Sequence, residues 1–248
     1  MLIEQSAQSN RWRQVAPGAK ASFALGGLIA AYGAVSPGAS AAVAVLLALV
    51  TVFGAGVPFG RYCRVATPAL LFLLISTFSL AWQLDLGKSG IALSLQSAPA
   101  ALEKIAVVIS RSLGALAALL FLVLTTPLPD LIVLLRRLRV PETLLELMVL
   151  CYRMLFVLSE AVHDTHTAQA ARLGYASPRL ALRSLGGLAA CLTLQVWQRA
   201  QDLHLAAQAR NHHGPLRFLE TEFPQGHRDL VFALAAAGGL ILLARLLP

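Results

Sequence analysis

The chain has 248 residues, of which 57% are hydrophobic and only 13% are charged. A soluble domain of this size carries about 25% charged residues, so the composition indicates an integral membrane protein. The net charge of +8 could suggest a nucleic-acid-binding protein. No basic run is interleaved with aromatic residues, however, so we expect no nucleic-acid partner and place the basic side chains on the cytoplasmic side of a bilayer.

The N-terminal segment and the cysteines further restrict which kind of membrane protein this can be. Residues 1–20 are polar and include Arg11, Arg13 and Lys20, so we expect a cytoplasmic N-terminus without a cleavable signal peptide. The three cysteines lie far apart and form no CxxC pattern. Neither a disulfide nor a zinc site is therefore expected.

Five segments are apolar enough to span a bilayer, which needs about 20 mostly apolar residues. A turn at Ser36-Pro37-Gly38 joins the first two segments. The expected spans are residues 21–35, 39–57, 65–83, 105–125 and 230–247. The predicted fold class is thus an all-α integral membrane protein of about five transmembrane helices, with a large cytoplasmic insert of long helices between the fourth and the fifth.

The distribution of Lys and Arg orients these spans, because cytoplasmic loops are enriched in both residues. Sixteen of them lie in the N-terminal segment, the loop between spans two and three, and the insert. Only Lys88 and Lys104 lie on the other side, in loop 84–104. We therefore expect the N-terminus in the cytoplasm and the C-terminus outside. The expected regions are 1–20 (cytoplasmic), 21–126 (four membrane helices), 127–228 (cytoplasmic helices) and 229–248 (C-terminal transmembrane helix).

The insert is predicted to consist of one short and two long helices. Asp130 is expected to cap a helix over 131–139. Pro141-Glu142 starts a helix that could run to Arg172, a rod of about 45 Å. After Gly174, Pro178 starts a second long helix over 179–210, which ends near a second glycine–proline pair, Gly214-Pro215.

The two long helices end in similar sequences, Gln169-Ala170-Ala171-Arg172 and Ala207-Gln208-Ala209-Arg210. An arginine there complements the negative end of the helix dipole. It also offers several hydrogen-bond donors to carboxylates or carbonyls of a partner. For one box alone, simple capping is the better reading, whereas two matching boxes favour docking. The candidate docking residues are Ala171, Arg172, Leu173, Ala209, Arg210 and Asn211.

The sequence gives weaker support to a metal site and to a functional charge within the membrane. His163 and His166 have a spacing that can ligate a metal, and His212-His213 form a second pair. Both pairs lie in the insert rather than at membrane depth, so we interpret them as solvated histidines and expect no metal site and no cofactor. Arg111 in the fourth span is the intramembrane candidate, because a charge at this depth is either functional or reaches towards the interface.

Two other protein classes are a membrane-bound enzyme and a channel or transporter that works alone. The chain contains no GxxxxGK[ST] motif and so is not itself an ATPase of that type. A membrane enzyme would need acidic or histidine clusters at a membrane-level cavity, and none is evident. A self-contained transporter would need broken, polar spans. The two arginine boxes favour a membrane protein that docks onto a soluble partner over both of these classes.

Residues 125–214 resemble the transmembrane T component of energy-coupling factor (ECF) transporters, and most closely the cobalt/nickel CbiQ/NikQ type. Besides the two arginine boxes, the resemblance is carried by Thr125-Thr126-Pro127-Leu128-Pro129-Asp130-Leu131, Leu138-Arg139-Val140-Pro141, Tyr152-Arg153 and Glu160-Ala161.

The resemblance implies that each box docks into a groove on one of two cytoplasmic ATP-binding-cassette ATPase subunits. The long helices would pass the ATPase movements to a separate membrane subunit that captures the substrate. That substrate would be cobalt, as used for cobalamin biosynthesis, with nickel or a vitamin as alternatives. It further implies an inner or plasma membrane location among lipids. In that family the boxes usually read Ala-Arg-Gly, so Leu173 and Asn211 depart from the pattern at the position that shapes the turn.

Overall fold

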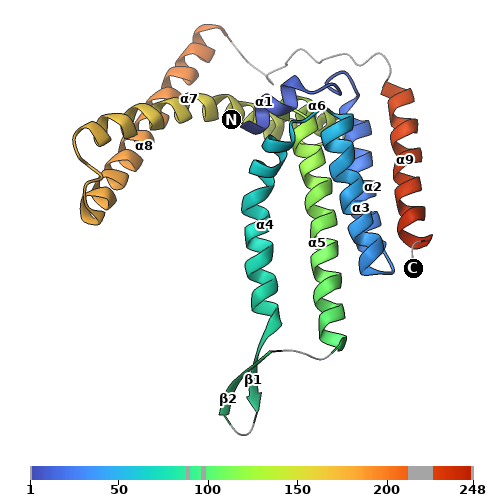
Figure 1. Cartoon of the computed structure of the whole chain (residues 1–248). Coiled ribbons are helices and arrows are strands. Elements are labelled where there is room, and N and C mark those ends of the chain that lie inside the picture. Colours follow the sequence, from blue (N-terminus) through green and yellow to red (C-terminus); the bar gives the residue numbers. More distant parts are fainter. Residues whose placement is uncertain (1, 88–89, 96–98, 212–225, 247–248) are drawn as a thin grey trace. The chain divides into compact units, whose positions relative to one another are not determined.

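The computed structural model describes residues 2–87, 90–95, 99–211 and 226–246. The chain divides into two compact units (Figure 1). One comprises Met1–Leu134 with Thr221–Pro248, and the other comprises Leu135–Glu220. Each unit is described by itself below.

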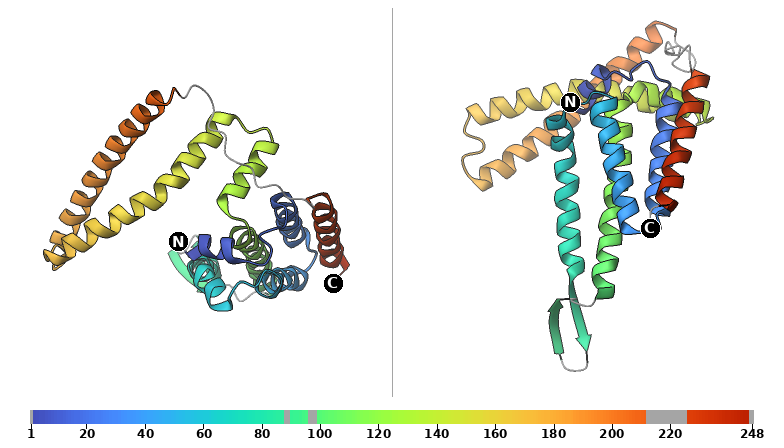
Figure 2. Two further views of the ribbon diagram at one scale, coloured as in Figure 1. Left: turned by 90° about the horizontal axis from the view of Figure 1, so that it is seen from above. Right: turned by 45° about the vertical axis from the view of Figure 1, so that its right-hand side comes forward.

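The first unit is a helix bundle (Figure 2). Four of its long helices correspond to expected spans 39–57, 65–83, 105–125 and 230–247, and the helix expected over 21–35 begins earlier, at Pro17. Its helices are α1 (Leu2–Ser9), α2 (Pro17–Gly33), α3 (Pro37–Leu49) with the π-helix η1 (Val50–Gly54), α4 (Phe59–Ala81), α5 (Pro99–Thr125), most of α6 (Leu128–Arg137) and α9 (Gly226–Leu246).

Small residues hold this bundle together, as is usual where helices pack in lipid. The core between α2, α3 and α5 is rich in alanine and includes Ala31, Val43 and Leu47, none of them exposed. The Ser40 hydroxyl donates to the Ala31 carbonyl at 3.0 Å, which ties α3 to α2. The predicted turn between them is confirmed, because Pro37 starts α3 and the Ser36 hydroxyl accepts from the Ala39 amide at 3.1 Å.

Five described helices are long and apolar enough to cross a membrane by length and composition. Four of them correspond to expected spans: α3 together with η1, α4, α5 and α9. The fifth is α8 (Pro178–Ala209) of the second unit, which we assigned to the cytoplasm, and α2 with 17 residues is not among the five. A helix of 17 residues nevertheless lies at the lower limit for a span, and α2 packs against α3, α5 and α9.

A β-hairpin follows α4, in a region that we expected to be a span end and a loop. Strands β1 (Trp82–Gly87) and β2 (Gly90–Leu95) pair antiparallel, with Leu84 opposite Leu93. Because α5 already begins at Pro99, Glu103 lies on a helix rather than in the expected loop. The third expected span, residues 65–83, ends at Ala81 in the structure, because β1 begins at Trp82.

The second unit is a helical hairpin of α7 (Glu142–Ala171) and α8 (Pro178–Ala209). The predicted helix starts at Glu142 and Pro178 are confirmed, and the Ser177 hydroxyl caps α8 by accepting from the Leu180 amide at 3.3 Å. The short helix α6 differs from the prediction. It begins at Leu128, so Asp130 lies in its first turn and does not cap it.

Candidate functional site

The two arginine boxes end their helices with nearly the same backbone geometry. Arg172 is the last half-helical residue of α7, with φ −91° and ψ 14°, and Arg210 holds the same position on α8, with φ −91° and ψ 10°. The next residue is left-handed in both cases, with φ 57° at Leu173 and 49° at Asn211. The similarity of the two boxes therefore extends from sequence to conformation.

Left-handed backbone at these positions explains why glycine would suit the third position of each box. Glycine adopts positive φ freely, asparagine tolerates it, and other L-residues pay about 1–2 kcal/mol. The Leu173 amide donates to the Ala170 carbonyl at 3.0 Å, and the Asn211 amide donates to the Gln208 carbonyl at 2.9 Å. The sequence departures at Leu173 and Asn211 thus leave a hydrogen-bonded left-handed turn in place.

The turn after the first box is braced by side chains from both helices. The Gln169 amide group donates to the Ser184 carbonyl at 3.0 Å, and its oxygen accepts from the Tyr175 hydroxyl at 2.8 Å. The Ser184 hydroxyl in turn donates to the Gly174 carbonyl at 2.9 Å. The first arginine is therefore presented on a fixed corner, where α7 and α8 meet and from which they diverge (Figure 2, left).

Both arginine side chains are available to a partner. Arg172 and Arg210 are exposed, and within the described ranges neither guanidinium group has a hydrogen-bond or ion-pair partner. Since α8 has 32 residues, its axis separates the two boxes by about 48 Å. The structure thus shows two similar, exposed cations, one at the α7–α8 turn and the other at the far end of α8.

The histidines predicted to be solvated differ in their surroundings. The His166 ring lies 4.7 Å from the Tyr175 ring, centroid to centroid, and so helps to brace the α7–α8 turn. His212 and His213 lie outside the described residues. Among the residues that are described, no three His, Cys, Asp or Glu side chains are grouped to hold a metal ion.

Arg111 lies on α5, where it is half-buried. In the part of the chain that the structure describes, its guanidinium group has no hydrogen-bond or ion-pair partner. Its role at membrane depth stays a hypothesis.

Sequence reasoning missed a feature of the N-terminal segment, which we call the N-terminal strap (residues 2–20). The Asn10 side-chain amide donates to the Thr125 carbonyl at 2.9 Å, and the Lys20 ammonium donates to the same oxygen at 3.0 Å. Both polar side chains are buried, Lys20 to an exposed fraction of 2%. Residues 1–20 are recognisably polar, but nothing in the sequence indicates that they contact the end of the fourth expected span.

Burial also changes the acid–base chemistry beside the strap. Desolvation lowers the pKa of Lys20, which precedes the first expected span, to about 8, although Asp130 and Asp229 oppose this shift. Desolvation raises the pKa of Asp130, against the opposing effect of Lys20. Each group therefore partly offsets the cost of burying the other's charge.

A family model described as the cobalt transport protein CbiQ matches residues 9–219. The chain belongs to the CbiQ family. The match covers the strap residues Asn10 and Lys20 as well as both arginine boxes. It confirms the resemblance and supports a multi-pass membrane protein of cobalt transport.

Relatives of this CbiQ-family chain agree with that assignment. A cobalt transport protein CbiQ of Rhodobacter capsulatus is 38% identical over 88% of this chain and 87% of its own length. An uncharacterized protein of Methanocaldococcus jannaschii is 28% identical over 99% of this chain and 93% of its own length. A putative fused cobalt transport protein CbiMQ of Methanocorpusculum labreanum is 32% identical over 58% of this chain and 24% of its own length.

Proposed function

We propose that this chain is the coupling T subunit of an ECF-type, ATP-driven cobalt importer. It has no catalytic role of its own and lies in the plasma or inner membrane, with its N-terminus in the cytoplasm and its C-terminus outside. Two cytoplasmic ATP-binding-cassette subunits bind its arginine boxes and hydrolyse ATP. A nickel or vitamin importer is the alternative within the same class.

The observation that carries this proposal is the geometric match of the two boxes. Arg172 and Arg210 share one backbone conformation, are both exposed, and are separated by about 48 Å along α8. Two equal docking points at this spacing fit two copies, or two similar subunits, of one partner better than they fit one small protein. A helix end that only needed a cap would not require an unengaged guanidinium group.

The helical hairpin of α7 and α8 is also suited to transmit movement. Its turn is fixed by the hydrogen bonds around Gln169 and Ser184, so a displacement of the corner at Arg172 acts on both helices. A pair of hydrogen-bonded helices transmits such a displacement with little loss, because packed helical elements do not deform continuously.

We place α8 in the cytoplasm although its length and composition would permit a span. It contains Arg179, Arg183, Arg199 and Asp202. Charges of this kind cost several kcal/mol each at membrane depth. The cytoplasmic assignment also puts both boxes on the side where ATP is available.

A membrane partner subunit is supported by the fused relative. That relative is named as a putative fused cobalt transport protein CbiMQ, and this chain covers 24% of its length. The rest of the fused relative is long enough to hold a second component. For the present chain, we expect that component to be a separate subunit. We propose that this separate subunit captures the cobalt ion.

A pull-down in mild detergent from the native membrane tests the docking step. Arg172→Glu and Arg210→Glu should each weaken ATPase association, because reversing one charge of a buried pair costs at least about 2–5 kcal/mol. The double variant should recover no ATPase. Arg153→Glu is the matched control, since Arg153 is exposed on α7 about 28 Å along the helix from Arg172 and belongs to neither box. Full ATPase recovery with the double variant contradicts docking, and a stable chain without any partner favours a self-contained membrane protein.

A further inference from the structure

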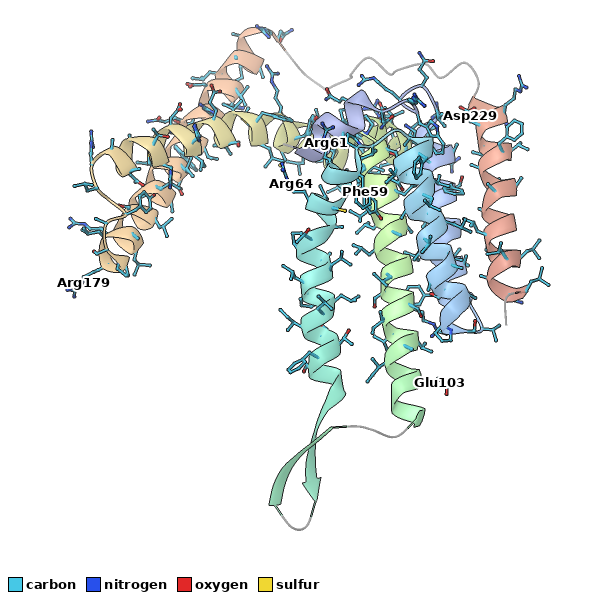
Figure 3. All side chains as sticks on the ribbon, in the orientation of Figure 1. Phe59, Arg61, Arg64, Glu103, Arg179 and Asp229 are labelled. Carbon is cyan, nitrogen blue, oxygen red and sulfur yellow. The ribbon has the colours of Figure 1, made fainter. Side chains whose placement is uncertain are left out.

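The N-terminal strap is attached to four elements of the bundle. The Arg61 guanidinium of α4 donates to the Ser6 hydroxyl at 3.3 Å, and the Arg11 amide donates to the Ala55 carbonyl, just after η1, at 3.1 Å. The Ala16 amide donates to the Asp229 carboxylate of α9 at 3.3 Å. Figure 3 shows Arg61 at the start of α4 and Asp229 at the start of α9.

The fourth attachment is the strongest, because it engages the end of α5. The Asn10 side-chain amide reaches three carbonyls, those of Ala7, Leu124 and Thr125. Lys20 adds a second donor to Thr125. The Trp12 ring meets the Phe121 ring edge-on, with centroids 5.9 Å apart, one turn before Thr125.

These donors satisfy a specific need of the helix end. The last carbonyls of a helix lack intrahelical donors and carry the negative end of its dipole. At Thr125, which is not exposed, water cannot supply the missing donors. A buried amide and a buried ammonium therefore fix the end of α5 more tightly than either a solvated end or an apolar contact would.

The position of these contacts in the chain indicates what they could do. Thr126 and Pro127 follow directly, α6 begins at Leu128, and the chain then enters the helical hairpin that carries the arginine boxes. We propose that the strap clamps the point at which the coupling helices join the bundle, with Asn10 and Lys20 as positioning residues that make the bundle follow the hairpin. The clamp rests on the proposed coupling function.

Without the clamp, movement of the hairpin would be absorbed by local bending or fraying at Thr125–Pro127. ATP would then still be hydrolysed, while the bundle and the captured ion would move less. A strap that served only to stabilise the fold would lower the amount of transporter, and with it ATP hydrolysis and import in equal proportion. The ratio of Co²⁺ imported to ATP hydrolysed separates the two roles.

The test uses the whole transporter in proteoliposomes, with Co²⁺ as the probe. Asn10→Leu and Lys20→Met remove the two donors at nearly constant volume. We expect the double variant to retain ATPase association and at least half of the ATP hydrolysis, with at least fivefold less Co²⁺ imported per ATP. Arg13→Met is the matched control, because Arg13 is an exposed strap cation whose hydrogen bond stays within the strap, to the Gln8 carbonyl. It should leave the ratio unchanged.

A conservative variant provides the rescue. A cavity of about 400 Å³ adjoins Lys20 and is lined by Phe23, Phe121 and Phe232 among others, so a guanidinium group has room there. Lys20→Arg should restore at least half of the import ratio that Lys20→Met loses. An unchanged ratio in the double variant overturns the clamp, as does a proportional loss of hydrolysis and import. Failure of the unaltered chain to bind an ATPase would instead overturn the coupling function itself.

Discussion

Ser184 and Gly174 lie in direct contact across the α7–α8 turn. The Ser184 hydroxyl donates to the Gly174 carbonyl at 2.9 Å. A methyl group at position 174 would lie 2.5 Å from that hydroxyl oxygen and 2.9 Å from the Gln169 carbonyl oxygen. Glycine is therefore required here by space, at a position next to the first arginine box.

Gly174→Ala should open this turn. Overpacking of this kind costs about 1–3 kcal/mol. We expect amide hydrogen exchange in the segment 169–176 of the full chain to accelerate about fivefold or more, and ATPase binding through Arg172 to weaken. Gly187→Ala is the control, because its nearest neighbour would be the Gln169 amide nitrogen at an ordinary 3.7 Å.

A second variant separates the two clashes. Gly174→Ala combined with Ser184→Gly removes the hydroxyl but leaves the Gln169 carbonyl in place, so protection should return only in part. Unchanged exchange in Gly174→Ala alone would show that the turn is not as tightly packed as the distances indicate.

Leu173→Gly should have the opposite effect on the same turn. Leucine at φ 57° is strained, and glycine removes that strain while adding some entropy to the unfolded chain. The net gain is about 0.5–1 kcal/mol, which slows exchange in this segment about two- to fivefold. Leu173→Ile should accelerate it, since a branched side chain fits positive φ less well. Asn211→Gly should change less, because asparagine already tolerates this conformation, and an equal gain there would contradict the strain argument.

The helices of the insert could be read from the sequence because their boundaries are set locally. Pro141, Ser177 and Pro178 define helix starts by their own chemistry, and the structure places α7 and α8 within one residue of the predicted ends. The arginine boxes were recognisable for the same reason, as short patterns at predicted helix ends. Their shared left-handed turn was not, because glycine, the usual signal for it, is absent from both.

The strap escaped prediction because its partners are distant in sequence. Asn10 contacts carbonyls 114 and 115 residues away, and nothing in the composition of either segment specifies that pairing. Lys20 was counted as a cytoplasmic charge, which is what most lysines at a span end are, whereas it is buried against Thr125. The β-hairpin after α4 was likewise missed, since each strand has only six residues and Trp82 directly follows the apolar run of α4.

Close packing of α2 against α9 leads to a third prediction. A methyl group on Gly26 would collide with the Ala237 methyl group. Gly26→Ala should therefore destabilise the bundle by about 1–3 kcal/mol, measured as a lower midpoint of heat denaturation in detergent by size-exclusion chromatography. The double variant Gly26→Ala/Ala237→Gly moves the methyl group to the other helix and should restore most of the loss.

Gly33 provides the matched control on the same helix. Nothing lies within 4 Å of a methyl group at that position. Gly33→Ala should thus leave the midpoint unchanged or raise it slightly, since alanine favours helix by about 0.5–1 kcal/mol over glycine. Equal losses at positions 26 and 33 would show that glycine flexibility, rather than contact with Ala237, matters for the bundle.

The two ends of α8 give a decisive test of the proposed topology. If α8 lies in the cytoplasm, Arg179→Cys and Gln208→Cys will react with a membrane-impermeant maleimide from the same side, in inside-out vesicles only. If α8 crosses the membrane, the two positions will react from opposite sides.

The assay needs a background without cysteine and a calibrating position. The three native cysteines, Cys63, Cys151 and Cys191, are free and must first be replaced by serine. Glu103→Cys calibrates the assay, because Glu103 is exposed near the start of α5 (Figure 3) and should react only in right-side-out vesicles. Labelling of position 208 only in right-side-out vesicles, and of position 103 only in inside-out vesicles, would reverse the orientation inferred from the basic residues, and with it the assignment of the arginine boxes to the side of the ATPases.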